Sequence, residues 1–221
     1  MKYLFSAFVL LIFVSCGSNE SDESGEQNTY EPLPYIGQHD AFITTENGTE
    51  KWDTIYYTIP KFEFINQDCV TVNNETVKGH VYVANFFFTS CPSICPAMME
   101  QMKRLQEMTA DVDELIILSH TIDPDRDSIG KLNQFIADKE IDTHNWHFLY
   151  NEREYVHFIA REGYLLSANK DDNADGGFIH SDFFTLVDRE GHIRGMYQGT
   201  VTEEVDKLAE DIKKLIKNEY N

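Results

Sequence analysis

Positively charged residues are scarce in this chain. Its 221 residues include 38 Asp and Glu but only 18 Lys and Arg, so the formal net charge is −20. A chain this acidic is repelled by phosphate backbones and by anionic lipid headgroups. We therefore expect no nucleic-acid partner and no electrostatic attachment to a membrane surface. Hydrophobic residues make up 42% of the chain, which is enough for the core of one domain of ordinary size.

The apolar run near the N-terminus is too short to cross a membrane as a helix. It covers residues 4–14, about eleven residues, whereas a spanning helix needs about 20. Lys2 precedes the run and Ser15-Cys16-Gly17 follows it, an order that resembles the signal peptide and lipobox of bacterial lipoproteins. The resemblance implies that Cys16 carries a lipid; the alternative is an ordinary signal peptide with an incidental cysteine. We therefore predict a lipid-anchored protein of the bacterial cell envelope that faces the periplasm or is displayed on the surface.

Aliphatic side chains are absent from residues 17–30, which are mostly small, amide and acidic. Such a segment buries too little apolar surface to offset the entropy of ordering it. We predict a signal peptide over residues 1–15, a flexible lipid-anchored tether over 16–31 and an irregular arm over 32–60. The arm is expected to carry short strands around residues 55–57. The remaining residues, 61–221, are predicted to form one folded domain.

Segments with the periodicity of strands alternate with segments of helical periodicity through this domain. Residues 81–88 are almost all apolar and β-favouring, as in a strand buried on both faces. Alternating strands and helices, then a hairpin and a last helix, predict an α/β fold with a mostly parallel central sheet flanked by helices. A thioredoxin-like domain begins with a strand, a cysteine pair at a helix start, a helix and a strand. The predicted strands are 62–65, 81–88, 115–118, 146–149, 183–187 and 192–197, and the predicted helices are 94–108, 128–138, 152–161 and 202–217.

Cysteine is also scarce, with four in the chain. If Cys16 carries a lipid, Cys69, Cys91 and Cys95 remain. Because there is no second closely spaced pair, a structural zinc site with four thiolate ligands is disfavoured. Cys69 is predicted to be a buried bystander, the alternative being a third thiol that traps the pair in a wrong disulfide.

Cys91 and Cys95 stand where the strand at 81–88 passes into a helix. Residues four apart lie on the same face of a helix, with Cβ atoms about 5–6 Å apart. We place Cys91 at or just before the first turn, where free N–H groups and the helix dipole favour a thiolate and where Pro92 is tolerated. Two such sulfurs can bind one soft metal ion or oxidise to a disulfide. The alternative is a plain disulfide or two buried thiols without a function.

A third ligand would close the coordination of an ion held by two thiolates. Among eight histidines, His180 follows Gly176-Gly177 and precedes the strand at 183–187. That strand is expected to pair beside the strand at 81–88, so the loop before it would overhang the cysteines. Two glycines allow a mobile loop that could deliver or withdraw an imidazole. On position alone, His180 is as well explained as a loop histidine with satisfied hydrogen bonds.

Three blocks of sequence resemble the Sco/SenC family, whose members are membrane-tethered, thioredoxin-fold copper chaperones. Residues 86–96 (Phe-Phe-Phe-Thr-Ser-Cys-Pro-Ser-Ile-Cys-Pro), followed by Met98, resemble the family signature. Residues 118–127 resemble its strand and Asp-Pro-x-Arg-Asp loop, and residues 178–191 resemble its metal-histidine block. The resemblance extends over roughly residues 60–217 and implies a bacterial lipoprotein form of a cytochrome c oxidase assembly factor.

The resemblance implies that Cys91, Cys95 and His180 bind copper, as Cu(I) or Cu(II). The implied partners are the copper-receiving subunit of a respiratory oxidase and a thiol reductant, besides the membrane that holds the N-terminal lipid. Our leading hypothesis is an assembly factor that delivers copper to, or prepares, the binuclear copper site of that oxidase. The alternative is a thiol–disulfide reductase in which Cys91 and Cys95 are the redox dithiol. A peroxidase is a weaker third hypothesis, because Thr89 lies only two positions before Cys91.

The chain also departs from the family pattern. Ser93 stands where many members carry an acidic residue between the cysteines, so the charge near the metal would differ. Asp68-Cys69 stands where a glycine turn would be more usual. Asp123 ends a strand near the site, where it would either hydrogen-bond the metal loop or tune a thiol. A capping role in the turn that follows is an equal alternative.

Overall fold

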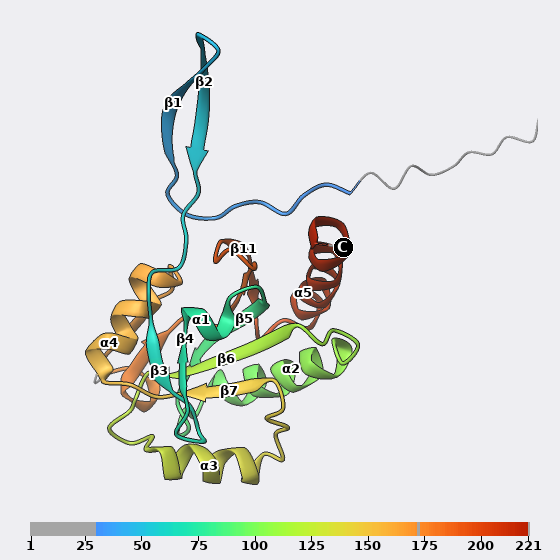
Figure 1. Cartoon of the computed structure of the whole chain (residues 1–221). Coiled ribbons are helices and arrows are strands. Elements are labelled where there is room, and N and C mark those ends of the chain that lie inside the picture. The colour runs from blue at the N-terminus through green and yellow to red at the C-terminus, as the bar shows by residue number, and fades with distance from the viewer. Residues whose placement is uncertain (1–29, 172, 221) are drawn as a thin grey trace, which may run out of the picture. The chain divides into compact units, whose positions relative to one another are not determined.

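A five-stranded sheet forms the centre of the computed structural model, which describes residues 30–171 and 173–220 (Figure 1). The strand order is β11-β10-β5-β6-β7. β5 (Val81–Phe87), β6 (Leu115–Thr121) and β7 (Trp146–Leu149) are parallel. β10 (Phe183–Val187) pairs antiparallel with β5 and with β11 (Ile193–Gln198). The predicted mostly parallel α/β sheet is confirmed, including the pairing of β10 beside β5.

Both faces of the sheet are covered by other elements, which explains why β5 is apolar except for Asn85. All seven of its residues are buried. Successive residues of a strand point to opposite faces, and here each face meets an aromatic partner. Phe86 contacts Tyr164, while Phe87 contacts Phe135 on the other side.

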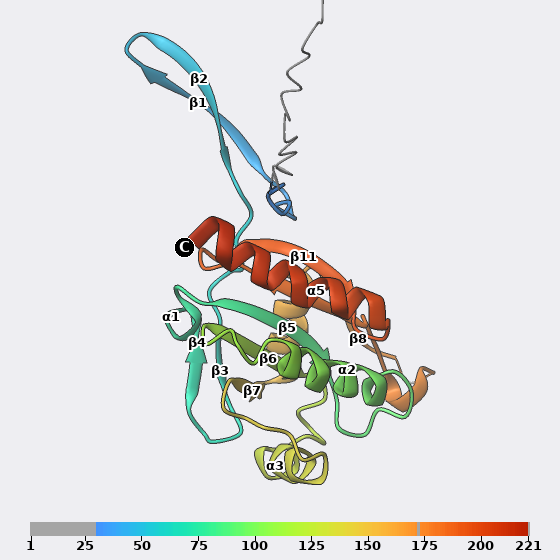
Figure 2. The same ribbon diagram turned by 90° about the vertical axis from the view of Figure 1, so that its right-hand side faces the viewer.

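Five α-helices are described, and the four longest follow the predicted helices closely. They are α2 (Cys95–Met108), α3 (Ile129–Asp138), α4 (Arg153–Phe158) and α5 (Thr202–Leu215). α4 continues as a π-helix over Ile159–Gly163 and α5 as another over Ile216–Tyr220. α2 and α5 lie side by side (Figure 2). None of the helices in the described ranges is long and apolar enough to cross a membrane.

The arm contains a regular hairpin that sequence analysis missed. β1 (Asp40–Glu46) pairs antiparallel with β2 (Thr49–Ile55). Asn47 and Gly48 connect them with φ angles of 52° and 80°, which is the two-residue turn that Asn-Gly favours. The prediction of short strands around residues 55–57 is therefore wrong, because β2 ends at Ile55 and the turn signal lies earlier. Every residue of β2 is exposed.

Two smaller hairpins also went unpredicted. β3 (Glu63–Ile65), which was expected, pairs with β4 (Thr71–Asn73), and the short helix α1 (Asn74–Val77) follows. β8 (Ala168–Lys170) pairs with β9 (Phe178–His180), with a 3-10 turn over Asp175–Gly177 between them. Residues 62–65 alternate and so marked β3, whereas the three residues of β8 (Ala-Asn-Lys) and of β9 (Phe-Ile-His) do not alternate. The signal peptide of residues 1–15 and the lipidation of Cys16 lie outside the described residues.

Candidate metal centre

Cys91 and Cys95 do not lie on one helical face as predicted. α2 begins at Cys95, with Ile94 as its N-cap and Pro96 in its first turn. Cys91 lies in the preceding loop, where its N–H donates to the carbonyl of Phe88 at 3.2 Å. The reason is Pro96, because a helix that began at Cys91 would carry this proline in its interior, without an N–H and against a carbonyl one turn earlier. Pro96 therefore takes the first-turn position expected for Pro92.

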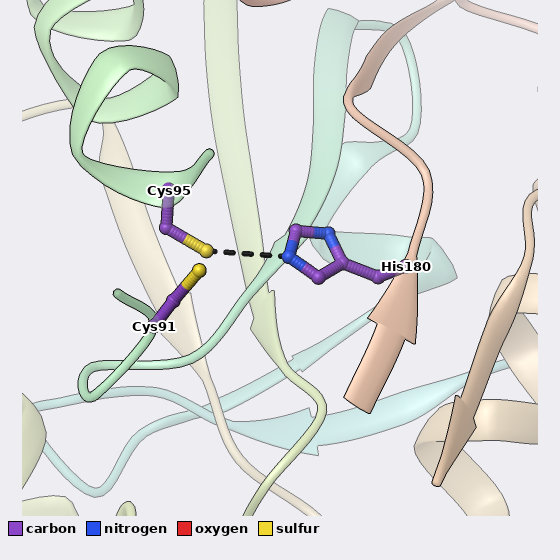
Figure 3. Close-up of side chains that lie close together, drawn as sticks. All are labelled: Cys91, Cys95 and His180. Carbon is purple, nitrogen blue, oxygen red and sulfur yellow. Dashed lines mark hydrogen bonds between the residues drawn. The ribbon is translucent and has the colours of Figure 1, made fainter. Parts of the chain in front are cut away.

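The loop nevertheless brings the two sulfurs together with His180 (Figure 3). The ligand atoms of Cys91, Cys95 and His180 all lie within 4.8 Å of one another. His180 Nε2 is 3.3 Å from the Sγ atom of Cys95. Both thiols are buried, with 8% of Cys91 and 3% of Cys95 exposed, and both are free. The structure thus assembles the three residues proposed from sequence, from the cysteine loop, the start of α2 and the end of β9.

The imidazole of His180 is oriented by its other ring nitrogen. Nδ1 lies 3.0 Å from the carbonyl oxygen of Ser181, which can only accept a hydrogen bond. Nδ1 is therefore assigned the proton, and the lone pair of Nε2 points toward the sulfurs. An outer hydrogen bond of this kind is typical of histidine ligands to metals, because it fixes both the tautomer and the ring.

The two thiols have pKa values shifted in opposite directions. The pKa of Cys91 is lowered chiefly by a hydrogen bond from the Cys95 thiol, against the opposing effect of burial. The pKa of Cys95 is raised by the same contact with Cys91 and by burial. Cys91 is therefore the first to become a thiolate. Cys91 is the residue expected to ionise, but the main cause is the partner thiol and not the helix dipole.

Two sulfurs and one imidazole nitrogen form a donor set for soft and borderline ions such as copper. The side chains already converge, so an ion could be held with little rearrangement. A small pocket of about 100 Å³ opens beside Cys91 and His180 and gives a route of entry. Its other lining residues are Phe88, Ser93, Ile94, Phe178 and Ile179.

Comparison with known proteins decides the family. The family model of SCO1/SenC matches residues 53–217, which is most of the chain. The chain belongs to the SCO1/SenC family. A SCO1 protein homolog of Bacillus subtilis is 32% identical over 175 residues, which cover 78% of this chain and 90% of the relative.

Solved structures agree with the assignment to SCO1/SenC. A SCO1/SenC family lipoprotein from Bacillus anthracis is 30% identical with a TM-score of 0.67, covering 72% of this chain and 95% of that one. BsSco is 30% identical with a TM-score of 0.65, covering 73% of this chain and 95% of that one. It is described as a member of the Sco family of cytochrome c oxidase assembly proteins, and a disulfide switch has been identified in it. ScoI of Bradyrhizobium japonicum, solved with copper bound, is 21% identical with a TM-score of 0.60, covering 72% of this chain and 99% of that one. This likeness shows the shared fold. The predicted Sco/SenC membership and thioredoxin-like fold are confirmed.

Asp127 supports the cysteine loop of this SCO1/SenC chain, a role that sequence analysis missed. Its buried carboxylate accepts hydrogen bonds from the backbone N–H of Thr89 at 2.9 Å and from the hydroxyls of Thr89 and Thr121. The loop that carries Cys91 is thereby tied to the end of β6. The sequence signal was present in the resemblance itself, because Thr89 and Asp127 belong to two of its three blocks.

Asp123 takes the turn role rather than a place on the metal loop. Its side chain is 2% exposed, pairs with Arg126 and lies 3.9 Å from Arg153. Burial raises its pKa, and Arg126 opposes that shift. The loop before His180 is reached through Arg126, whose Nη2 donates to the carbonyl of Gly176 at 2.7 Å.

The predicted burial of Cys69 is wrong. Cys69 is exposed at the turn between β3 and β4, with φ of 60°. The left-handed backbone at Cys69 agrees with the glycine more usual at this position, because glycine adopts positive φ without a steric cost.

A second group of metal-type side chains lies at the turn between β10 and β11. Ligand atoms of Asp188, Glu190 and His192 also lie within 4.8 Å of one another. The Asp188 carboxylate, however, already accepts hydrogen bonds from the guanidinium of Arg194 at 3.1 Å and from the backbone N–H of His192 at 2.8 Å. We interpret this group as an ion-pair network.

Proposed function

We propose that this SCO1/SenC protein binds copper through Cys91, Cys95 and His180 and serves the assembly of a respiratory cytochrome c oxidase. The observation that carries the proposal is the convergence of two free thiols and an oriented imidazole within 4.8 Å. The copper-bound ScoI structure and the description of BsSco as a member of a family of oxidase assembly proteins support the metal and the client. We propose further that the protein delivers copper to the binuclear copper site of that oxidase or prepares this site for copper.

The arrangement suggests an order of ligand exchange. Cys91 and Cys95 are fixed close to the core, because Asp127 ties the cysteine loop to β6 and Cys95 starts α2. His180 ends β9, which belongs to a separate two-stranded sheet. An incoming thiolate from the client, entering through the pocket, would therefore replace His180 first and the cysteines afterwards. Copper supplies an acceptor for these soft ligands when it is bound.

Cys95 must lose its proton before its sulfur can act as a ligand. Its pKa is raised by the contact with Cys91 and by burial. Copper binding therefore releases the proton of Cys95. Because a reaction that releases protons is favoured at higher pH, copper affinity should increase with pH.

The test is a copper titration of the reduced protein with absorption spectroscopy and a competing chelator. We expect one copper per chain and a loss of affinity of at least about tenfold on His180→Ala, since outer residues of metal sites alone contribute 10–100-fold. His144→Ala is the matched control, because this histidine is exposed and pairs with Asp142. Unchanged stoichiometry and affinity in the His180 variant would remove the three-ligand site.

A thiol–disulfide reductase is the second candidate, and the lowered pKa of Cys91 beside the Cys95 thiol favours it. The Cys91 thiolate would attack one sulfur of a client disulfide, which breaks the client's S–S bond, releases its other sulfur as a thiolate and forms a mixed disulfide. The Cys95 sulfur would then displace the client's thiol, leaving a Cys91–Cys95 disulfide and a reduced client, and giving up its proton. A reduction potential measured against glutathione discriminates: a very stable disulfide together with negligible copper affinity favours the reductase.

We also propose that the chain is anchored to a membrane of the bacterial cell envelope by a lipid on Cys16. The sequence before Cys16 and the lipoprotein relative from Bacillus anthracis support this. Metabolic labelling with a palmitate analogue should label the full chain and should not label Cys16→Ala. Equal labelling of the two would contradict the proposal.

A further inference from the structure

His180 stands on a hairpin whose hydrogen bonds are largely its own. β8 and β9 form a two-stranded sheet apart from the central one, with Ala168 opposite His180 and Lys170 opposite Phe178. The N–H of Ser181 donates to the carbonyl of Ser167 at 3.0 Å, which extends the same pairing. These bonds shape the hairpin, but they do not fix its position over the cysteines. Phe178 and Ala168 pack in the buried core, and one further contact reaches the hairpin from a neighbouring loop.

Arg126 makes that contact from the loop after β6. Its Nε donates to Asp123, and its Nη2 donates to the carbonyl of Gly176 at 2.7 Å. The guanidinium also lies 5.5 Å from the ring centre of Phe178 on β9 and 5.8 Å from that of Phe88. Both distances are within the range of cation–π attraction. One side chain therefore touches the hairpin that carries His180 and the residue that begins the cysteine loop.

The backbone of Gly176 packs directly on the cysteine loop. Its φ is +74°, and a Cβ added there would lie 2.8 Å from the Phe88 ring and 3.1 Å from Cδ of Pro92. The absence of a side chain lets the hairpin approach this closely. The carbonyl of Gly176 accepts the hydrogen bond from Arg126. This bond holds the hairpin in its close contact with Phe88 and Pro92.

Asp123 orients the guanidinium of Arg126. Its carboxylate is buried and also lies 3.9 Å from Arg153, whose guanidinium is 5.8 Å from the centre of the Phe178 ring. An arginine fork held by a carboxylate on one side can present its remaining N–H groups in a fixed direction. The Arg126 side chain is half exposed, so a docking partner could reach it and release the hairpin.

We propose that Arg126 is a positioning residue that holds the His180 hairpin against the cysteine loop and thereby sets how long His180 stays on the bound ion. The second part rests on the proposed copper function, whereas the first part concerns the metal-free chain as well. Arg126 acts through Gly176 and Phe178, without a direct contact to the ligands.

The first experiment measures amide hydrogen exchange in the reduced, metal-free protein. In Arg126→Ala, the amides of β9 should exchange about tenfold faster than in the wild type, while those of β5 should be unchanged. Arg126→Lys keeps the charge but loses the fork and should lie between the two. Arg104→Ala is the matched control, since Arg104 pairs with Asp206 between α2 and α5. Wild-type exchange in β9 of Arg126→Ala would overturn the proposal.

The second experiment measures copper release to a chelator by stopped flow. Arg126→Ala should release copper about tenfold faster, in line with the usual effect of outer residues at metal sites. The same substitution in a His180→Ala background should have no further effect, because the hairpin then carries no ligand. An equal acceleration in both backgrounds would overturn the positioning role. If the wild type binds no copper, the proposed function fails, and the exchange experiment alone decides whether Arg126 holds the hairpin.

Discussion

At the scale of single residues, the placement of the site depends on a few side chains with little freedom. Pro96 sets the first turn of α2 and so keeps Cys91 out of the helix. The carbonyl of Ser181 fixes the tautomer of His180. In each case a short-range steric or hydrogen-bonding rule decides which atom faces the metal position.

His120 is a buried histidine that the proposed site does not use. It stacks on Phe86 with ring centres 4.7 Å apart and is fully buried. Among the described residues, its Nε2 has no hydrogen-bond partner. Burial lowers its pKa from 6.5 to about 3. Between these pH values the unfolded chain binds a proton at this position and the folded chain does not, so stability falls as pH falls below about 6.5.

We predict that His120→Phe makes this acid destabilisation shallower by one proton. The free energy of unfolding of the wild type should lose up to about 1.4 kcal/mol more per pH unit than that of the variant, between about pH 6 and 4. Urea denaturation at a series of pH values measures the slopes. His144→Gln, an exposed position, is the control and should retain the wild-type slope. Parallel curves for the wild type and His120→Phe would show that His120 titrates in the folded chain.

The candidate metal ligands could be predicted from the sequence, but the residues that hold their loops in place could not. Cys91 and Cys95 were indicated by spacing, and His180 by the resemblance together with its place before a strand. Asp127 and Arg126 act through hydrogen bonds to the backbone N–H of Thr89 and the carbonyl of Gly176. Backbone partners are chosen by the path of a loop, which has no periodic signal to read.

At the scale of elements, length decided what could be predicted. β5 has seven buried residues and α2 has fourteen residues, so their patterns were clear. β8 and β9 have three residues each, so a strand pattern could not be seen in them. The β1–β2 hairpin is long enough, but its exposed strands lack an apolar face, and only its Asn-Gly turn marked it.

The β1–β2 hairpin contributes little to the stability of the domain, because its residues are exposed or nearly so. Trp52, its largest side chain, is 70% exposed. Most of the hairpin also precedes residue 53, where the family match begins. Asp40 and Ile55 are paired, so a short linker can join them.

We predict that replacing residues 41–54 by Gly-Ser-Gly changes the free energy of unfolding by less than about 1 kcal/mol, as is usual for exposed positions. Copper affinity should be unchanged. Thermal unfolding and the copper titration measure the two effects. A large loss of either would mean that the hairpin packs on the domain or contributes to the site.

At the scale of the whole molecule, Arg194 joins three distant parts of the chain on β11. Its side chain is 1% exposed. The guanidinium pairs with Asp188 at the β10–β11 turn and with Glu219 near the C-terminus, at 2.8 Å. It also donates to the carbonyl of Leu33 at 2.8 Å and lies 4.2 Å from the ring centre of Tyr35, both in the arm. The arm and the last helix are therefore held by the same buried cation.

Removing this cation leaves the buried carboxylate of Asp188 without the guanidinium that neutralises it, which is why the loss should be large. We predict that Arg194→Ala lowers the free energy of unfolding by about 3–5 kcal/mol, the usual effect of deleting one member of a buried ion pair. Limited proteolysis should then cut both the arm and the C-terminal residues faster than in the wild type. Arg104→Ala is the control, because Arg104 pairs with Asp206 at a more exposed position. If the arm alone became sensitive, Glu219 would have other partners that suffice, and Arg194 would not be the link between the two ends of the folded domain.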